Sequence, residues 1–356
     1  MTDHQPFSNP RSDIRHDSPS DSDSSLAGNI NGSVNRNINE TLDGCFAEID
    51  WQAPWLRHLC QLDYLSRTII SKSIVQPSEQ EIGLSSIAPL NHSPDVVAAV
   101  LNTALQQRVS DLAIPPPTTE PTHHHQAQTL RFVSQAALPE GESYECFIGE
   151  SGNIPTRDNL HDLFNGSIWL TFPKTKALLN HYHMLEIAEQ GVSESRGRVR
   201  DTITVFDENG AVLVTADASI GDALIDFDWQ ASLVNTRKQW DDPKQPNPHA
   251  EAAVYIFGHA LLEQLIHPRK PLCAHSIVIN VTADFFALSL SQRMQHLDDR
   301  VANYMDTLLS QQGVTPRQLA PLPILGVPYF WEENHDSHFY EDTYVFRSGR
   351  RKKPKR

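Results

Sequence analysis

The chain has 356 residues, of which 39% are hydrophobic and 8% aromatic, and its formal net charge is −15 at pH 7. This charge disfavours bare nucleic acid and anionic lipid as partners of the acidic body, because like charges repel. The four cysteines form no CxxC pair, which favours a reducing, cytoplasmic location, and no apolar stretch approaches the roughly 18 residues of a membrane-spanning helix, so we expect no membrane insertion.

The first part of the chain combines disordered segments with short helices. Residues 1–45 are rich in Ser, Asn and Asp and can bury little apolar surface, so we predict an acidic, polar, disordered tail. Order begins near Phe46 with a helical pattern, and residues 95–109 form an apolar helix. A Pro- and His-rich insertion follows at residues 112–128, and its three consecutive histidines are more typical of a solvated loop than of a metal site.

The best candidate site lies on a helix that should follow Thr156, a good N-cap, and break near Gly166. One face of this helix carries short polar side chains and no Lys or Glu. The four residues fall at positions i, i+3, i+4 and i+7 and share one side of the helix: Asp158, His161, Asp162 and Asn165. We expect this face to line a pocket. The alternatives are an internal polar network or simple helix caps.

The clearest β signal lies between residues 200 and 215. Two β-branched runs flank the acidic tetrapeptide 207–210, which ends in Asn-Gly, and this pattern predicts a β-hairpin. The acidic turn offers oxygens for a cation, but turn chemistry explains it fully and we favour the turn. Arg200 and Asp201 open the predicted hairpin and are candidate site residues, or else a buried ion pair.

Helices dominate the rest of the chain. Residues 173–190 and 250–266 have helical patterns, and the second is strongly apolar. Residues 219–240 suit two short helices, and residues 284–312 suit a long amphipathic one. Residues 275–281 (HSIVINV) are typical of a buried strand. This order lacks regular βαβ alternation, so we predict an α+β fold that is mainly helical, with a β-hairpin and at least one further strand packed on helices.

We expect one domain over residues 46–347, followed by a short basic disordered tail at residues 348–356. Within the domain, His259 and Glu263 lie at i and i+4 on the apolar helix, and His275 opens the buried strand. Histidines with carboxylates suit either a divalent metal or a general acid–base pair.

The candidate metal ligands are residues from three predicted elements: His161, His259, Glu263 and His275. The alternative for His259 is a satisfied core histidine. No nucleophile elbow, phosphate-binding loop, dinucleotide motif or HExxH sequence is present, so the sequence specifies no cofactor beyond a permitted divalent metal.

Several segments occur in a characteristic order. They include LPEGESYECFI, the NLHD-x-FN run of the candidate helix, and LPILGVP near the end of the chain. Together they resemble a family of proteobacterial proteins known as domain of unknown function 3025, and the resemblance covers roughly residues 46–351. No activity, cofactor or catalytic residue is established for that family, so the resemblance implies none.

Three kinds of function remain open. The first is an enzyme or ligand-binding pocket around His161 and Asp162. The second is a structural or protein-interaction module that docks partners on its aromatic C-terminal segment, residues 321–347. The third is a nucleic-acid-associated factor that uses only the basic end, from Arg347 to Arg356, to contact phosphates.

Overall fold

A computed structural model describes residues 46–74, 95–111, 130–190 and 197–349. The predicted disordered tail, the Pro- and His-rich insertion and the last seven residues of the basic tail lie outside the described residues. Predictions for those segments therefore stay predictions.

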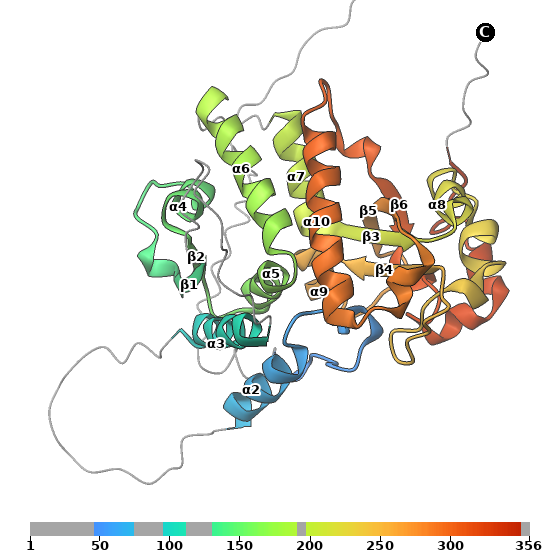
Figure 1. Ribbon diagram of the computed structural model, residues 1–356, viewed down its shortest axis with the longest axis horizontal. Coiled ribbons are helices and arrows are strands. Elements are labelled where there is room, and N and C mark those ends of the chain that lie inside the picture. The colour runs from blue at the N-terminus through green and yellow to red at the C-terminus, as the bar shows by residue number, and fades with distance from the viewer. Residues whose placement is uncertain (1–45, 75–94, 112–129, 191–196, 350–356) are drawn as a thin grey trace, which may run out of the picture. The chain divides into compact units, whose positions relative to one another are not determined.

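Helices and short strands alternate along the described chain (Figure 1). The helices are α2 (Leu62–Ile74), α3 (Val96–Asp111), α4 (Tyr144–Ser151), α5 (Leu160–Thr171), α6 (Pro173–Gln190), α7 (Arg198–Asn209), α8 (Ala218–Ile225), α9 (His259–Gln264) and α10 (Leu290–Leu309). The strands are β1 (Arg131–Ser134), β2 (Asn153–Thr156), β3 (Gly210–Thr215), β4 (Ala252–Ile256), β5 (Cys273–Asn280) and β6 (Ala320–Pro323).

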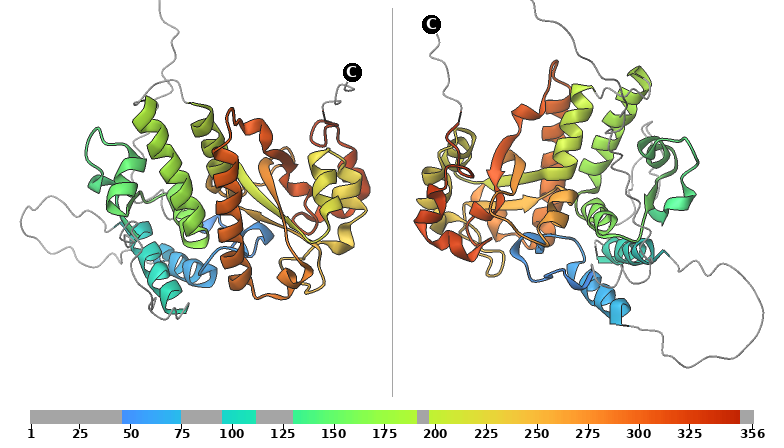
Figure 2. Two further views of the ribbon diagram at one scale, coloured as in Figure 1. Left: turned by 45° about the horizontal axis from the view of Figure 1, so that its top comes forward. Right: turned by 180° about the vertical axis from the view of Figure 1, so that it is seen from behind.

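The larger sheet has the strand order β4-β3-β5-β6. Strand β3 runs antiparallel to β4 and parallel to β5, and β5 runs antiparallel to β6. All six residues of β3 are buried, which explains its continuous apolar sequence. Figure 1 shows α10 crossing in front of this sheet, and Figure 2 shows the same elements from two further directions. Strands β1 and β2 form a separate parallel pair, so the α+β class is confirmed.

The predicted β-hairpin is wrong in its first half, because that segment is helix α7. Ile203 and Phe206 are buried whereas Asp201 is exposed, a spacing that follows the helical period. The β-branched side chains of α7 pack against β5 and α6, and this tertiary contact outweighs their strand propensity. The chain passes directly from α7 into β3 at Gly210, so no turn joins two strands there.

The predicted apolar helix over residues 250–266 is also wrong in its first half. Its first part is the fully buried strand β4, which pairs with β3, and α9 begins only at His259. A short, wholly apolar run suits a buried strand as well as a buried helix, so periodicity cannot separate them. His259 and Glu263 keep their expected spacing on α9.

Helix α5 begins later than predicted and does not break at Gly166. Thr156 ends β2, and the Asn159 side chain caps α5 by accepting the Asp162 N–H at 2.8 Å. Gly166 lies inside the helix. A Cβ there would lie 2.2 Å from Leu101 Cδ1, so glycine permits the close approach of α3 and α5.

Other predicted elements are confirmed with shifted ends. Helices α3 and α6 and strand β5 occupy the expected positions. The long amphipathic helix divides into a short 3-10 turn, Ala283–Ala287, and α10, because Ser289 begins a new helix with a capping box. No helix among the described residues is both long and apolar enough to span a membrane.

Buried apolar side chains form one cluster that extends from Phe46 to the C-terminal segment. Four aromatic residues of that segment are at most 7% exposed: Phe330, Phe339, Tyr340 and Phe346. These rings build the core, which corrects the expectation that they form a docking surface. Tyr344, in contrast, is 69% exposed.

Candidate functional site

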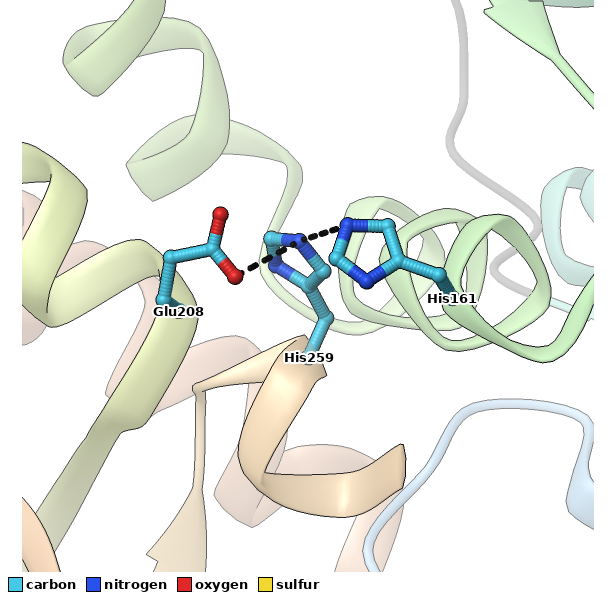
Figure 3. Close-up of side chains that lie close together, drawn as sticks. All are labelled: His161, Glu208 and His259. Atoms are coloured by element: carbon cyan, nitrogen blue, oxygen red, sulfur yellow. Dashed lines mark hydrogen bonds and ion pairs between the residues drawn. The ribbon is translucent and has the colours of Figure 1, made fainter. Parts of the chain in front are cut away.

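Two histidines and a glutamate from three helices meet at one point (Figure 3). His161 lies in the first turn of α5, Glu208 in the last turn of α7, and His259 at the start of α9. The Nε2 atoms of His161 and His259 are 3.0 Å apart, and His259 Nε2 is 3.6 Å from Glu208 Oε2. Among the described residues, no other group of three His, Cys, Asp or Glu side chains has the spacing of metal ligands.

A glycine brings His259 against Glu208. Gly258 donates its N–H to the Gly210 carbonyl at 2.8 Å. A Cβ on residue 258 would lie 2.5 Å from both the Glu208 carbonyl oxygen and the Gly210 nitrogen. Both obstacles are backbone atoms, so only glycine permits this crossing of α9 past the end of α7.

Each imidazole also has a carboxylate beside its Nδ1 atom. His161 Nδ1 lies 3.0 Å from Glu263 Oε2, and His259 Nδ1 lies 3.9 Å from Asp207 Oδ2. The Glu263 carboxylate favours the His161 tautomer with its proton on Nδ1, which leaves the His161 Nε2 lone pair free. The Asp207 carboxylate is too far from His259 Nδ1 for a hydrogen bond. The two Nε2 atoms face each other at 3.0 Å, which suits a hydrogen bond when one of them carries a proton and suits two ligands of one metal ion when neither does.

The two rings occupy different electrostatic environments. The hydrogen bond to Glu263 raises the pKa of His161. Burial lowers the pKa of His259 to about 4, so this ring is neutral at pH 7. Burial also raises the pKa of Glu208, and the nearby Asp207 carboxylate acts in the same direction. A cation bound among these groups would reduce the repulsion between the neighbouring carboxylates and would offset the cost of their desolvation.

Asp162 and Asn165, by contrast, are held by internal partners. The Arg157 guanidinium donates twice to the Asp162 carboxylate, each time at 3.0 Å. Asn165 donates to the Tyr144 hydroxyl at 3.1 Å and accepts from Lys176 Nζ at 2.9 Å. Both side chains also line the same cavity as His161, so on this part of α5 the polar face lines a pocket, as predicted, and forms the internal network that the sequence left as an alternative.

Lys176 joins that network to the histidines. Its Nζ atom donates to Asp207 Oδ1 at 2.6 Å and lies 5.5 Å from the centroid of the Trp169 ring. Burial would raise the pKa of Asp207, but Lys176 outweighs burial through its charge and its hydrogen bond, and it lowers that pKa. Asp207 therefore stays ionised beside His259.

The histidine cluster forms part of the wall of a cavity of about 360 Å³. Helices α4 to α7 and α9 supply most of the lining, which is rich in charged side chains. Cavities of this size accept metabolite-sized molecules. The cluster is thus accessible to a small ligand.

Three predicted residues lie away from the cluster. Asp158 precedes α5, and its carboxylate accepts the Val97 N–H at 2.8 Å, so it caps α3. Asp201 is exposed on α7, which excludes a buried ion pair with Arg200. His275 lies on β5 outside the group with metal-ligand spacing, and burial lowers its pKa. Arg200 lines the cavity.

Glu208, Asp207 and Lys176 are absent from the residues that the sequence predicts as site residues. The signal that finds the first two is helical spacing within the segment taken for a hairpin. The cavity-lining residues of α7 fall at i, i+3, i+4, i+7 and i+8: Arg200, Ile203, Thr204, Asp207 and Glu208. Such a stripe marks one face of a helix.

Comparison with sequence families matches residues 130–350 to the family described as Protein of unknown function (DUF3025). The chain belongs to this family. The DUF3025 match contains the whole histidine cluster but begins well after residue 46, where the resemblance was expected to start. No curated protein and no solved structure matches the chain.

Proposed function

We propose that this protein is a metal-dependent enzyme whose centre is a divalent metal ion bound by His161, His259 and Glu208. The observation that carries the proposal is the convergence of three potential ligand atoms. Ligands bound to zinc at about 2.1 Å with tetrahedral angles lie about 3.4 Å apart. The separations of 3.0 and 3.6 Å in the cluster bracket this value.

Three protein ligands leave one coordination position for water or substrate, which is typical of catalytic rather than structural zinc. The cavity beside the cluster supplies the space for that fourth ligand. Two imidazoles and one carboxylate suit Zn²⁺ and also Fe²⁺. Glu263 would orient the His161 ring through its Nδ1 atom.

A second candidate function is metal-independent acid–base catalysis by His161. It is favoured by the hydrogen bond between His161 and Glu263, which orients the ring and increases its basicity. His161 is 34% exposed, so a substrate in the cavity can reach it. Metal content separates the two functions.

The experiment measures metal binding by the full chain. Protein stripped with a chelator is loaded with Zn²⁺ or, under anaerobic conditions, with Fe²⁺, dialysed, and analysed by plasma mass spectrometry and calorimetry. We expect about one metal ion per chain. His161→Asn and Glu208→Gln should each lower the affinity about 100-fold or more, because each removes a ligand.

The matched control is His267→Gln, which removes a 77% exposed histidine just beyond α9. This variant should bind metal as the wild type does, and thermal unfolding should confirm that every variant is folded. A wild-type protein without metal, or equal losses in the control, would contradict the proposed function. Variants that lose only stability would identify the cluster as an internal network.

A further inference from the structure

Arg200 differs from the other basic side chains of the cavity because it has no counter-ion among the residues that the structure describes. Lys176 is paired with Asp207, and Arg157 is paired with Asp162. Among the described residues, Arg200 forms no ion pair, and its Nε atom is buried without a hydrogen-bond partner. A guanidinium has five N–H donors and no acceptor, and its planar fork of donors matches pairs of oxygens on a carboxylate or a phosphate.

Residues with an unpartnered buried nitrogen gather around this cavity. Eight buried side-chain nitrogens within the described part of the chain have no hydrogen-bond partner, and half of them belong to cavity-lining residues: Trp169, His183, Arg200 and His259. Native proteins leave few such groups, because each costs free energy. The Arg200 guanidinium can only donate, so a ligand that it binds must supply acceptor oxygens.

The charges of the side chains that line the cavity also favour an anionic ligand once a metal is bound. Three basic side chains face four carboxylates around the cavity. A divalent cation at the histidine cluster turns this slightly negative lining net positive. The loaded cavity then favours an anion, and Arg200 is the cation left to hold it.

We infer that this cavity binds a small molecule bearing a carboxylate or phosphate group, whose anionic oxygens are held by Arg200 while another part of the molecule reaches the metal. The inference rests on the proposed metal site for the second contact. It names the substrate class as anionic metabolites that fit about 360 Å³.

The test compares two arginines of α7. Arg200→Gln removes the cavity guanidinium, and Arg198→Gln removes an exposed arginine two residues away on the same helix. Calorimetry measures the binding of inorganic phosphate and of succinate to the full chain, with and without Zn²⁺. These probes distinguish phosphate from carboxylate recognition.

We expect at least one probe to bind the zinc-loaded wild type, and Arg200→Gln to weaken that binding about tenfold, as the loss of a charge-assisted contact does. Arg198→Gln should change it less than about twofold. Both variants should retain the metal.

Equal affinities for wild type and Arg200→Gln, or no binding of either probe, would overturn the inference even if zinc binds. A protein that binds no zinc would overturn the proposed function, and Arg200-dependent anion binding would then still support the anion site.

Discussion

Burial decides which histidines of this protein stay neutral. His161 is 34% exposed and bonded to a carboxylate, whereas His259 is 5% exposed. His58 is the clearest case of burial. It is 4% exposed, its Nε2–H donates to the Ile256 carbonyl at 2.7 Å, and burial lowers its pKa to about 4. It does not line the cavity of the cluster, so its titration can be measured separately.

Replacing His58 with Gln should flatten the pH dependence of stability. In the wild type the unfolded ring titrates near 6.5 and the folded ring near 4, so the unfolded state binds more protons between these values. Stability is therefore complete above pH 6.5 and falls as pH falls to 4, by about 3 kcal/mol from this residue. Urea unfolding at several pH values from 7 to 4 measures the effect.

Gln retains a donor near the position of Nε2 but cannot take up a proton in this range. The variant should lose less free energy of unfolding than the wild type over the same range, although it can be less stable at pH 7. Parallel stability curves for the two proteins would show that burial of His58 does not drive acid sensitivity.

The sequence predicts part of the site and misses the rest for identifiable reasons. His161, His259 and Glu263 stand out because a helical pattern places them beside apolar residues, and the structure brings all three together. The sequence offers Glu208 only as part of an acidic turn that could bind a cation, and it favours the turn, because the β-branched neighbours suggest a strand and Asn-Gly suggests a turn. The segment is helix α7 instead. Asp158 shares the helical spacing, but it caps α3, a partner that spacing within one segment cannot reveal.

At the scale of elements, the site depends on how α7, β3, β4 and α9 follow one another. Strand β3 begins where α7 ends, and only two residues separate the end of β4 from the start of α9. Since β3 and β4 are paired neighbours, the end of α7 and the start of α9 lie side by side. The sequence predicts most elements but not this junction, because local patterns favour a strand for α7 and a helix for β4. Pairing across distant segments decides both cases.

Gly258→Ala should disrupt this junction. The new Cβ would lie 2.5 Å from backbone atoms of Glu208 and Gly210, which cannot move without separating α7 from α9. We expect the free energy of unfolding to fall by about 2–4 kcal/mol, and the affinity for Zn²⁺ to fall because His259 is displaced from Glu208. Denaturant unfolding and calorimetry measure the two effects.

Gly149→Ala provides the comparison. Its Cβ would meet the sulfur and terminal methyl of Met184, the flexible end of a side chain that can move aside. That substitution lies in α4 and should change stability by less than about 1 kcal/mol, with zinc affinity unchanged. A Gly258→Ala variant as stable as Gly149→Ala would mean that the junction can relax and that glycine is not required there.

At the scale of the whole molecule, the core extends beyond the region that matches the family. The match begins at residue 130, yet Leu65 and Leu101 are completely buried in the same apolar cluster as the sheet. Asn102 donates to the Phe132 carbonyl at 2.7 Å and accepts the Phe132 N–H at 2.9 Å, so α3 completes the hydrogen bonding of β1. We propose that residues 46–347 fold as one domain.

A fragment of residues 130–356 should therefore fail to fold cooperatively. It loses the apolar side chains of α3, which contacts α5, and of α2, which contacts α3; each fully buried large one contributes about 1.5–3 kcal/mol. The loss of Leu65, Ile69, Val97 and Leu101, all at most 1% exposed, is comparable to the whole stability of a typical domain, about 5–15 kcal/mol. Urea unfolding followed by circular dichroism should show no sharp transition for this fragment.

A chain that lacks only residues 1–44 should behave differently. The sequence predicts that segment to be disordered, so its removal should leave the unfolding midpoint unchanged and the transition single. If instead the 130–356 fragment unfolds cooperatively at the midpoint of the full chain, residues 46–111 are an appendage and the domain begins at residue 130. Two separate unfolding transitions in the full chain would likewise show that residues 46–347 form two domains. The contact between α3 and α5 at Leu101 and Gly166 would then be an interface between those domains.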